Sequence, residues 1–478
     1  MKPRKRAISL AINIGCTALF FGCAVGPNYK RPTVASPGNF RSAPGAVTTN
    51  SLADLPWWDI YRDETLKSLI HTALTNNYDV LIAATRVEQA RQISAEARAQ
   101  FLPSINYQGV VSRGRNELFG TTIPDNGNTS SGAVTVAEAA WEVDLWGRIR
   151  RLNESARAQY LATEEARRGV MLSLVSAVAS SYFQLLQLDL QLQIAQRTAD
   201  SFDSSLKMFN QRLQGGVASR LDTSRASGAL ATTLAQVPQL EQQIVQTENQ
   251  INVLLGLNPG PVPRHTAMLQ QYTPPEIPTG LPSMLLERRP DIRAAEQQLV
   301  AANANVGVAV ANFFPRIGLT SFLGKVSPEL SAFTAGTANA WSVAAGAAGP
   351  IFQGGALRAQ YRQAKATREQ VELQYRQTTL GAFQDVADAL IAREKLAVAR
   401  SRLEQSVSDY RESVQIATQR YLAGTASYFE VLEAQQLLFP AETSLAQVEF
   451  NQLLVVVQLY EALGGGWNLG NPEFTSGD

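Results

Sequence analysis

The chain contains two copies of one short segment, Arg212–Asp222 (RLQGGVASRLD) and Arg420–Glu430 (RYLAGTASYFE). At a constant offset of 208 residues, an arginine, a glycine, an alanine, a serine and a final acid recur in the same order: Arg212 and Arg420, Gly216 and Gly424, Ala218 and Ala426, Ser219 and Ser427, Asp222 and Glu430. Glycine can adopt the left-handed conformation that ends one helix, and a serine three residues later can cap the next. Each copy is therefore predicted to be the bend of a helical hairpin.

The similarity between the two halves extends beyond the bends. Asp79–Ile105 matches Asp291–Ile317 without a gap at an offset of 212, and both segments share a Phe-x-Pro motif. Chance similarity between Ala- and Gln-rich helices is the alternative, but gapless offsets through two motifs argue against it. A period of about 210 residues is too long for a solenoid repeat. The sequence therefore indicates a duplicated domain.

The first 22 residues have the composition of a secretion signal. Four cations in residues 2–6 precede the apolar run Ala7–Phe21, which is too short to span a bilayer. Phe21-Gly22-Cys23 is similar to a bacterial lipobox, which predicts cleavage before Cys23 and acyl chains, palmitate among them, on that residue. Ordinary cleavage that leaves a free cysteine is the alternative, and Cys16 fits the pattern less well. Ala24 is not the aspartate that retains many lipoproteins at the inner membrane, so the outer membrane is expected.

Composition limits the function. Cleavage removes four of the 42 cationic side chains and none of the 41 acidic ones, so the mature chain is slightly acidic, which argues against nucleic acid as a partner. Two cysteines and two histidines without ligand spacing predict no metal and no cofactor besides the lipid on Cys23. The sequence has no nucleophile elbow, phosphate loop or dinucleotide fingerprint, so we expect no enzyme activity.

Four segments alternate between apolar and polar residues and are predicted to be strands, at about 104–113, 133–145, 316–325 and 341–352. In the second, Trp141 and Val143 lie on one face, and Glu138 and Glu142 lie on the other. An apolar face opposite a charged face is the pattern of an outer-membrane barrel. A half-buried strand of a soluble sheet gives a similar alternation.

Two helices are predicted to be very long. Arg148–Gln214 and Ala356–Leu422 each span 67 residues without a proline, which is ~100 Å if continuous. Leucines and valines at spacings of three and four residues in the first indicate a coiled coil. The return helix Arg220–Leu257 is much shorter, so we infer that it stacks end to end with Asp79–Phe101 beside the long helix.

The predicted organisation follows from these elements. It is a signal peptide (1–22), an extended N-terminal wrap (23–60), a first repeat (61–257), a proline-rich linker (258–282), a second repeat (283–464) and a tail (465–478). Four strands cannot close a barrel, and an open edge in lipid leaves backbone groups unpaired. Three chains would supply twelve strands and twelve helical columns. The expected fold is an internally duplicated α+β membrane protein, with a long α-helical coiled-coil barrel and a transmembrane β-barrel that trimerisation completes.

The motif GPNYKRP at Gly26–Pro32, the pair Trp57-Trp58 and the paired Gly-x-Ala-Ser bends together resemble the TolC-like outer-membrane efflux factors, in particular the lipoprotein branch that includes OprM and NodT. The resemblance covers essentially the whole mature chain. It implies a homotrimeric exit duct that joins a periplasmic adaptor protein and an inner-membrane pump of the RND type. Such a duct exports drugs, and so contributes to antibiotic resistance, or exports other small molecules.

The resemblance also implies a site. The bends would face the adaptor with six residues, Gly216, Ala218, Ser219, Gly424, Ala426 and Ser427. Tyr421 matches a tyrosine that links neighbouring helices at the periplasmic mouth, Asp222 matches its acidic partner, and Glu430 and Glu433 match an acidic ring. A spacing of three residues lets both glutamates share one helix face, so a trimer would carry six carboxylates that favour cations. Two solvated acids on a hairpin tip are the alternative. Ala426 stands where some members have an arginine, so the closing contacts are expected to differ.

Two other classes remain open from the residues alone. A periplasmic adaptor is also often a lipoprotein with a helical hairpin, but it would lack two sets of alternating strands and a duplication of this length. A purely structural coiled-coil lipoprotein is disfavoured by Leu330–Leu357, a run of 28 residues without a charged side chain. The exported substrate, the matching adaptor and pump, and the means of opening are not encoded in any motif.

Overall fold

The computed structural model describes residues 24–41, 51–115, 117–118, 121–122, 129–271, 280–327, 333 and 338–465. The predicted signal peptide, Cys23, part of the linker and nearly all of the tail lie outside the described residues. The chain divides into two compact units. The first unit comprises residues up to Thr33, Arg86–Glu164 and Ala294–Tyr375, and the second comprises Val34–Thr85, Glu165–Arg293 and Arg376 onward.

The first unit contains a four-stranded antiparallel sheet. Its strands are β1 (Ser104–Arg115), β4 (Thr129–Val143), β5 (Arg316–Ser327) and β6 (Asn339–Ala348), in the order β1-β4-β5-β6. The two repeats meet at the centre of the sheet, where Trp141 of β4 lies opposite Leu319 of β5. A short ribbon of β2 (Glu117–Leu118) and β3 (Thr121–Thr122) follows β1. β1 and β6 are therefore the edge strands, and each lacks a partner on one side within the four-stranded order.

The strands differ slightly from the predicted ranges. β4 begins at Thr129 because it pairs with the end of β1, where Thr129 lies opposite Arg115. β6 ends at Ala348, before the predicted position 352. Pro350 cannot donate to a ladder, and Gly349 packs so closely on Pro315 that an added Cβ would lie 2.8 Å from its Cα. The sheet thus ends where the chain turns toward its next long helix.

Large apolar side chains remain exposed on the strands of the single chain. The most exposed are Ile105, Tyr107, Val111, Leu323, Trp341 and Val343. A soluble sheet normally buries one such face, whereas a transmembrane barrel presents it to lipid. This exposure fits the barrel pattern better than the soluble alternative.

Residues that follow the predicted lipid site are fixed within the first unit. The Val25 N–H donates to the carbonyl of Trp146 at 3.0 Å, and the Arg151 guanidinium donates to the side chain of Asn28 at 2.7 Å. The Tyr29 hydroxyl donates to Glu296 at 3.0 Å. The N-terminal segment is therefore hydrogen-bonded to the rest of the first unit through both its backbone and its side chains.

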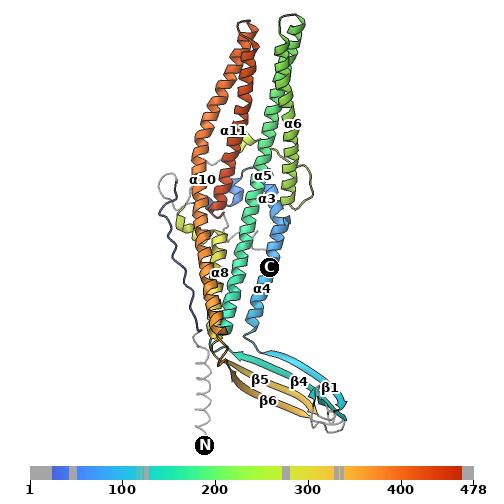
Figure 1. Ribbon diagram of the computed structural model, residues 1–478, viewed down its shortest axis with the longest axis vertical. Coiled ribbons are helices and arrows are strands. Elements are labelled where there is room, and N and C mark those ends of the chain that lie inside the picture. Colours follow the sequence, from blue (N-terminus) through green and yellow to red (C-terminus); the bar gives the residue numbers. More distant parts are fainter. Residues whose placement is uncertain are drawn as a thin grey trace. The chain divides into compact units, whose positions relative to one another are not determined.

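The long helices have the predicted bounds. They are α5 (Arg148–Gln214) and α10 (Ala356–Leu422), and their return helices are α6 (Arg220–Leu254) and α11 (Tyr428–Ala462). The shorter helices are α2 (Trp57–Ile60), α3 (Glu64–Asn76), α4 (Tyr78–Ala99), α7 (Leu285–Arg288) and α8 (Pro290–Ala311), with 3-10 turns η1 (Leu52–Asp54), η2 (Met268–Gln270) and η3 (Pro282–Met284). In the second unit α5 runs beside α6, and α10 runs beside α11 (Figure 1). Among the described helices, α5 alone is long and apolar enough to cross a membrane, but 67% of that stretch is buried inside the protein.

Short helices stack end to end, as predicted. Asn77 caps the start of α4 with its side-chain oxygen and donates its amide to the Leu254 carbonyl at the end of α6, at 2.9 Å. In the second half Arg289, which is the equivalent of Asn77 at an offset of 212, donates to the carbonyl of Ala462 at the end of α11, at 3.0 Å. The duplication is therefore visible in the contacts as well as in the sequence.

Polar side chains fix the segments that surround these junctions. Asp63 caps α3 through the amide of Thr65 and accepts hydrogen bonds from Tyr182 and Gln271. Arg264, in the proline-rich linker, pairs with Asp189 on α5 and with Glu248 on α6. The linker is thus tied to the first helical hairpin.

Candidate functional site at the helical bends

The two bends have the same backbone geometry. Gly216 and Gly424 have φ values of +76° and +75°, in the left-handed region that other residues rarely adopt. The amide that follows each glycine donates back into the end of the long helix, from Val217 to the Arg212 carbonyl and from Thr425 to the Arg420 carbonyl, both at 2.9 Å. These bonds close a helix C-terminus of the type that glycine permits. The predicted hairpin bends are therefore present in both halves.

The side chains at the two bends behave differently. In the first bend, Ser219 and Asp222 form a reciprocal capping box: the Asp222 amide donates to the Ser219 hydroxyl at 3.2 Å, and the Ser219 amide donates to the Asp222 carboxylate at 3.1 Å. In the second bend, the Ser427 side chain makes no capping hydrogen bond. Glu430, the equivalent of Asp222, instead accepts from Arg420 at 2.8 Å. The start of α6 is thus held by its own cap, and the start of α11 is not.

An aromatic cluster joins the two hairpins next to the bends. Phe209 of α5 packs on Tyr428 with ring centroids 3.9 Å apart and on Tyr421 with centroids 6.0 Å apart. Tyr421 and Tyr428 meet edge to face at 5.7 Å. The guanidinium carbon of Arg212 lies 4.5 Å from the centroid of the Tyr421 ring, within the range of a cation–π interaction. We call Phe209, Tyr421 and Tyr428 the aromatic cluster.

Aliphatic side chains complete this contact. Ala226 of α6 and Val431 and Leu432 of α11 are buried against the aromatic cluster. Burial also raises the pKa of the Tyr428 phenol above its ordinary value, because a phenolate would lose its water there. The two hairpins of one chain are therefore closed on each other by a largely apolar contact.

The four predicted mouth residues lie close to this contact but are not joined as a set. Tyr421 is buried in the aromatic cluster, and Asp222 is occupied by its capping box. Within the described residues no hydrogen bond joins Tyr421 to Asp222, so that link stays a prediction for the assembled trimer. Glu430 is paired with Arg420. Glu433 is exposed, and none of the ion pairs among the described residues includes it.

Sequence reasoning missed the partners of Tyr421. Phe209 and Tyr428 have no counterpart at the offset of 208, where Ala417 and Arg220 stand. A bend flanked by tyrosines in only one of two copies was the available signal. It indicates that the second bend has a contact that the first lacks.

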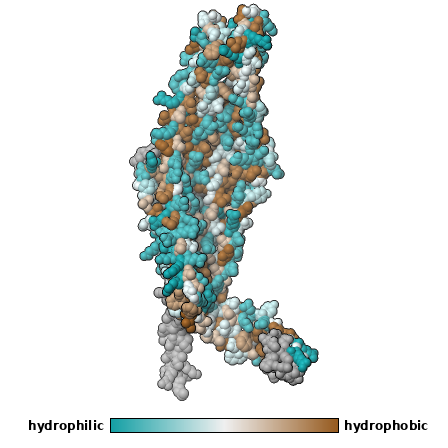
Figure 2. Space-filling model, viewed as in Figure 1, coloured by the Kyte–Doolittle hydropathy of each residue, from teal (hydrophilic) through white to brown (hydrophobic). Residues whose placement is uncertain are grey.

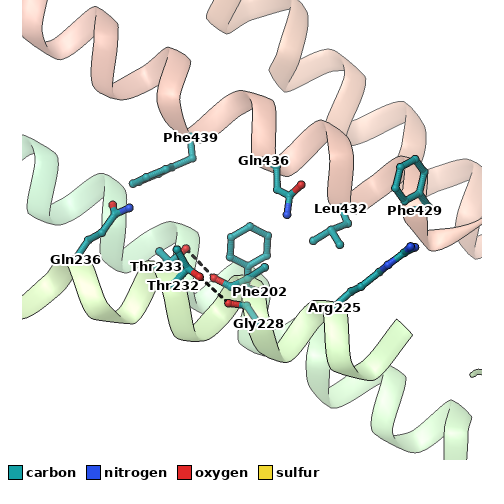
Figure 3. Close-up of a pocket in the computed structure, with 11 residues that line it drawn as sticks. Phe202, Arg225, Gly228, Thr232, Thr233, Gln236, Phe429, Leu432, Gln436 and Phe439 are labelled. Carbon is teal, nitrogen blue, oxygen red and sulfur yellow. Dashed lines mark hydrogen bonds between the residues drawn. The ribbon is translucent and has the colours of Figure 1, made fainter. Parts of the chain in front are cut away.

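A groove separates α6 from α11 just behind the aromatic cluster (Figure 3). Its volume is about 470 Å³, with Phe202 of α5 between the two helices. Arg225 of α6 reaches toward the ring of Phe429 on α11, with the guanidinium carbon 5.5 Å from the ring centroid, and Phe439 lies at the other end. Next to the cluster, a groove therefore lies between the two return helices.

The outer surface of the bends carries exposed apolar side chains. Val217 and Leu221 lie at the first bend, and Leu422 and Phe429 lie at the second; all four are more than half exposed. Hydrophobic residues are also scattered among polar ones over the surface of the long helices (Figure 2). Apolar surface at paired tips is typical of a protein interaction site. Among the described residues, no group of three or more His, Cys, Asp or Glu side chains is arranged to hold a metal ion.

Comparison with known proteins agrees with this architecture. The family model "Outer membrane efflux protein" matches residues 69–257 and 281–465, one match in each half. The toluene efflux pump outer membrane protein TtgC of Pseudomonas putida is 34% identical over 473 residues, which cover 97% of this chain and 96% of TtgC. The cation efflux system protein CusC of Escherichia coli is also 34% identical, over 95% of this chain and 98% of CusC.

Solved structures show the same fold. The outer-membrane channel OprN superimposes with a TM-score of 0.86 at 32% identity and covers 93% of this chain and 100% of its own. The open state of the MtrE outer membrane channel of Neisseria gonorrhoeae gives a TM-score of 0.84 at 30% identity, over 93% of this chain and 98% of MtrE. The similarity therefore extends over both units, and it includes a relative whose channel is open.

Proposed function

Because this chain belongs to the outer membrane efflux protein family, we propose that it forms an exit duct whose periplasmic mouth is closed at the second helical bend by the aromatic cluster and opens to pass small molecules outward. The family is one of transport channels, TolC-like in architecture, and the chain is the outer-membrane channel of a tripartite efflux system. The observation that carries the gate is the apolar contact of Phe209, Tyr421 and Tyr428 between the two hairpins. Contacts of this kind can be separated and remade without leaving a buried charge unpaired.

Three copies complete the channel. The edge strands β1 and β6 need partners in lipid, and a second copy can supply β6 beside β1 of the first. Continued around a threefold axis, this pairing gives a closed barrel of twelve strands from three chains. The exposed apolar residues of the strands then face the lipid.

The mouth is charged, but less than the sequence alone suggests. Because Arg420 pairs with Glu430 in the same chain, Glu433 is the member of the predicted Glu430–Glu433 ring that has no ion pair among the described residues of each copy. We expect a ring of three uncompensated carboxylates, with the three Glu430 carboxylates largely neutralised by Arg420. Such a ring still favours cations over anions, by a smaller margin than six free carboxylates would.

The bends are the proposed docking site for a periplasmic adaptor, and through it for an inner-membrane pump of the RND type. Support comes from the exposed apolar residues at both tips, such as Val217 and Leu422. Gly216, Ala218 and Ser219 in one bend and Gly424, Ala426 and Ser427 in the other are small, so a partner can approach the backbone closely. With Ala426 in place of an arginine, the bend itself offers no charge at that position to tie the mouth shut.

A lipid on Cys23 is proposed as a second anchor in the outer membrane. The hydrogen bonds of Val25 and Asn28 to the first unit support it, because they would hold the acylated residue close to the sheet. Substrate choice is expected to lie in the pump and adaptor. This chain is equally similar, at 34%, to relatives named for toluene and for cation efflux.

Ion conductance of the purified trimer in a planar bilayer tests the gated duct. The wild type should give small, cation-preferring steps. Glu433→Ala should weaken the preference more than Glu430→Ala does, and the double variant should weaken it most. Tyr421→Phe should raise conductance if its hydroxyl links neighbouring chains. Folded trimers that never conduct would refute the duct, and large steps insensitive to every variant would refute the gate alone.

A further inference from the structure

The hydrogen-bond ladder of helix α11 is interrupted about three turns from the second bend. Pro440 lies inside the helix. A proline has no backbone N–H and cannot bond the carbonyl four residues earlier, here that of Gln436. Interior prolines are the usual cause of a bent helix. Tyr428–Phe439, which we call the tip segment, can therefore tilt relative to the rest of α11.

Directly beyond the proline, α11 is held by charged side chains. Glu442 is 5% exposed, and its two carboxylate oxygens bind two different arginines. Oε2 accepts from Arg197 of α5, and Oε1 accepts from Nε and Nη2 of Arg411 of α10, at 3.0 and 2.7 Å. We call these three residues the clamp. It ties α11 both to its own hairpin and to the first hairpin.

On the other side of Pro440, the contacts of α11 with α5 are of a different kind. Among the described residues they include the apolar packing around the aromatic cluster and a neutral hydrogen bond from the Gln435 amide to the Ser201 hydroxyl at 2.9 Å. The tip segment also borders the groove of about 470 Å³, which leaves room beside it (Figure 3). Breaking neutral and apolar contacts costs less free energy than leaving a buried charge without its partner.

We infer that the clamp limits the moving part of α11 to the tip segment. Glu442 keeps α11 on α5 and α10 beyond Pro440, and when the mouth opens the tip segment is the part of α11 that tilts. The inference rests on the proposed gated mouth and adds the residues that confine the movement. Glu442 is accordingly a positioning residue: it acts on the mouth indirectly, because it sets how much of α11 can move.

Two cross-links placed on either side of the hinge test this confinement. Ser201 and Gln435 are hydrogen-bonded between α5 and α11 on the tip side, and Gln187 and Gln447 are hydrogen-bonded between the same helices beyond the clamp. Each pair is replaced by cysteines and joined in the full-length trimer with a short cross-linker that binds each cysteine through a disulfide, which a reductant cleaves. Single-channel openings are counted before and after reduction. We call Ser201–Gln435 the upper pair and Gln187–Gln447 the lower pair. The lower pair is the matched control for the upper pair.

The upper cross-link should lower the frequency of opening by ~tenfold or more, as expected for a lock on the moving element. The lower cross-link should leave the frequency unchanged. Closure by the lower cross-link, or free opening with the upper one, would overturn the inference. A reduced wild-type channel that never opens would instead refute the gated duct itself, so the two failures are distinguishable.

Removal of the carboxylate charge supplies a second, independent test. Glu442→Gln should raise spontaneous opening by about tenfold, because a longer stretch of α11 becomes free to move. The lower cross-link should then restore the wild-type frequency, which a merely destabilised helix would not allow. Glu449→Gln is the control, because Glu449 is also on α11 but pairs with Arg400 of its own hairpin, at 3.5 Å. Equal effects of the two variants, or no rescue by the cross-link, would count against the clamp.

Discussion

Phe209→Ala should open the mouth of this channel more than any single change in its acids. Phe209 is 1% exposed and supplies the ring that both Tyr421 and Tyr428 contact. It belongs to α5, whereas both tyrosines flank the second bend. Its removal therefore deletes the aromatic contact between the hairpins next to the bends and leaves the second bend itself intact.

The magnitude follows from the contacts. Truncation of a buried phenylalanine to alanine costs ~3–5 kcal/mol in a packed core, and this is an upper limit because the open state retains some burial. The two ring contacts alone are worth ~0.5–1.5 kcal/mol each beyond their buried area, which sets a lower range of ~1–3 kcal/mol. Since 1.4 kcal/mol is a factor of ten, the equilibrium between closed and open should shift toward open by about 5- to 150-fold per chain.

Single-channel recording of the purified trimer measures this shift as open probability. Phe183→Ala is the matched control, because Phe183 is also on α5, is 4% exposed and contacts the ring of Tyr61 with centroids 6.2 Å apart, away from the bends. Both variants should lower thermal stability, and only Phe209→Ala should raise open probability. An unchanged open probability in folded Phe209→Ala trimers, or an equal rise in Phe183→Ala, would refute the assignment of the cluster as the closing contact.

Three further outcomes are expected. Gly424→Ala should destabilise the second bend by ~1–2 kcal/mol, because φ is +75° there, and thermal unfolding of the trimer should show it. Arg420→Gln should release the Glu430 carboxylate from its ion pair and so increase cation preference in reversal-potential measurements, where no change would contradict the pairing. Burial raises the pKa of Asp63, but hydrogen bonds, that of Gln271 foremost, outweigh it and leave the pKa below its ordinary value of 3.8. Its ionised form therefore stabilises the fold above that value and loses this contribution as the pH falls through the lowered pKa, so Asp63→Asn should flatten the acid limb of thermal stability against pH.

The bounds of the long elements could be predicted from the sequence because they depend on local rules. The 67-residue lengths of α5 and α10 are set by glycine bends at one end and by proline or glycine at the other. The end-to-end stacking of α6 on α4 followed from a comparison of lengths alone. These features need no knowledge of which side chains meet.

The aromatic contact between the two hairpins could not be predicted in the same way. Phe209 and Tyr428 lie 219 residues apart, and helical periodicity does not state which buried face of one hairpin meets which face of another. The Glu430 pair was missed for a related reason: its partner Arg420 is in the bend motif itself, where the sequence suggested only turn geometry. A turn motif predicts backbone conformation, and it does not indicate which of its charged side chains form an ion pair.

Comparison of the two copies supports the proposal that the second bend, and not the first, is the moving part. Each copy contains an arginine, a serine and an acid at equivalent positions. In the first copy Asp222 and Ser219 cap the start of α6, and Arg212 lies on the Tyr421 ring. In the second copy the arginine takes the acid, and Ser427 is left without a capping bond. A lost cap weakens a helix start by ~1 kcal/mol, so the start of α11 is less stable than that of α6, while Glu442 in the interior of α11 is held by the clamp. The same short motif therefore gives a capped helix start in one half and an uncapped helix start in the other. The difference arises because Arg420 pairs with Glu430, whereas Arg212 lies on the Tyr421 ring and leaves Asp222 to the cap.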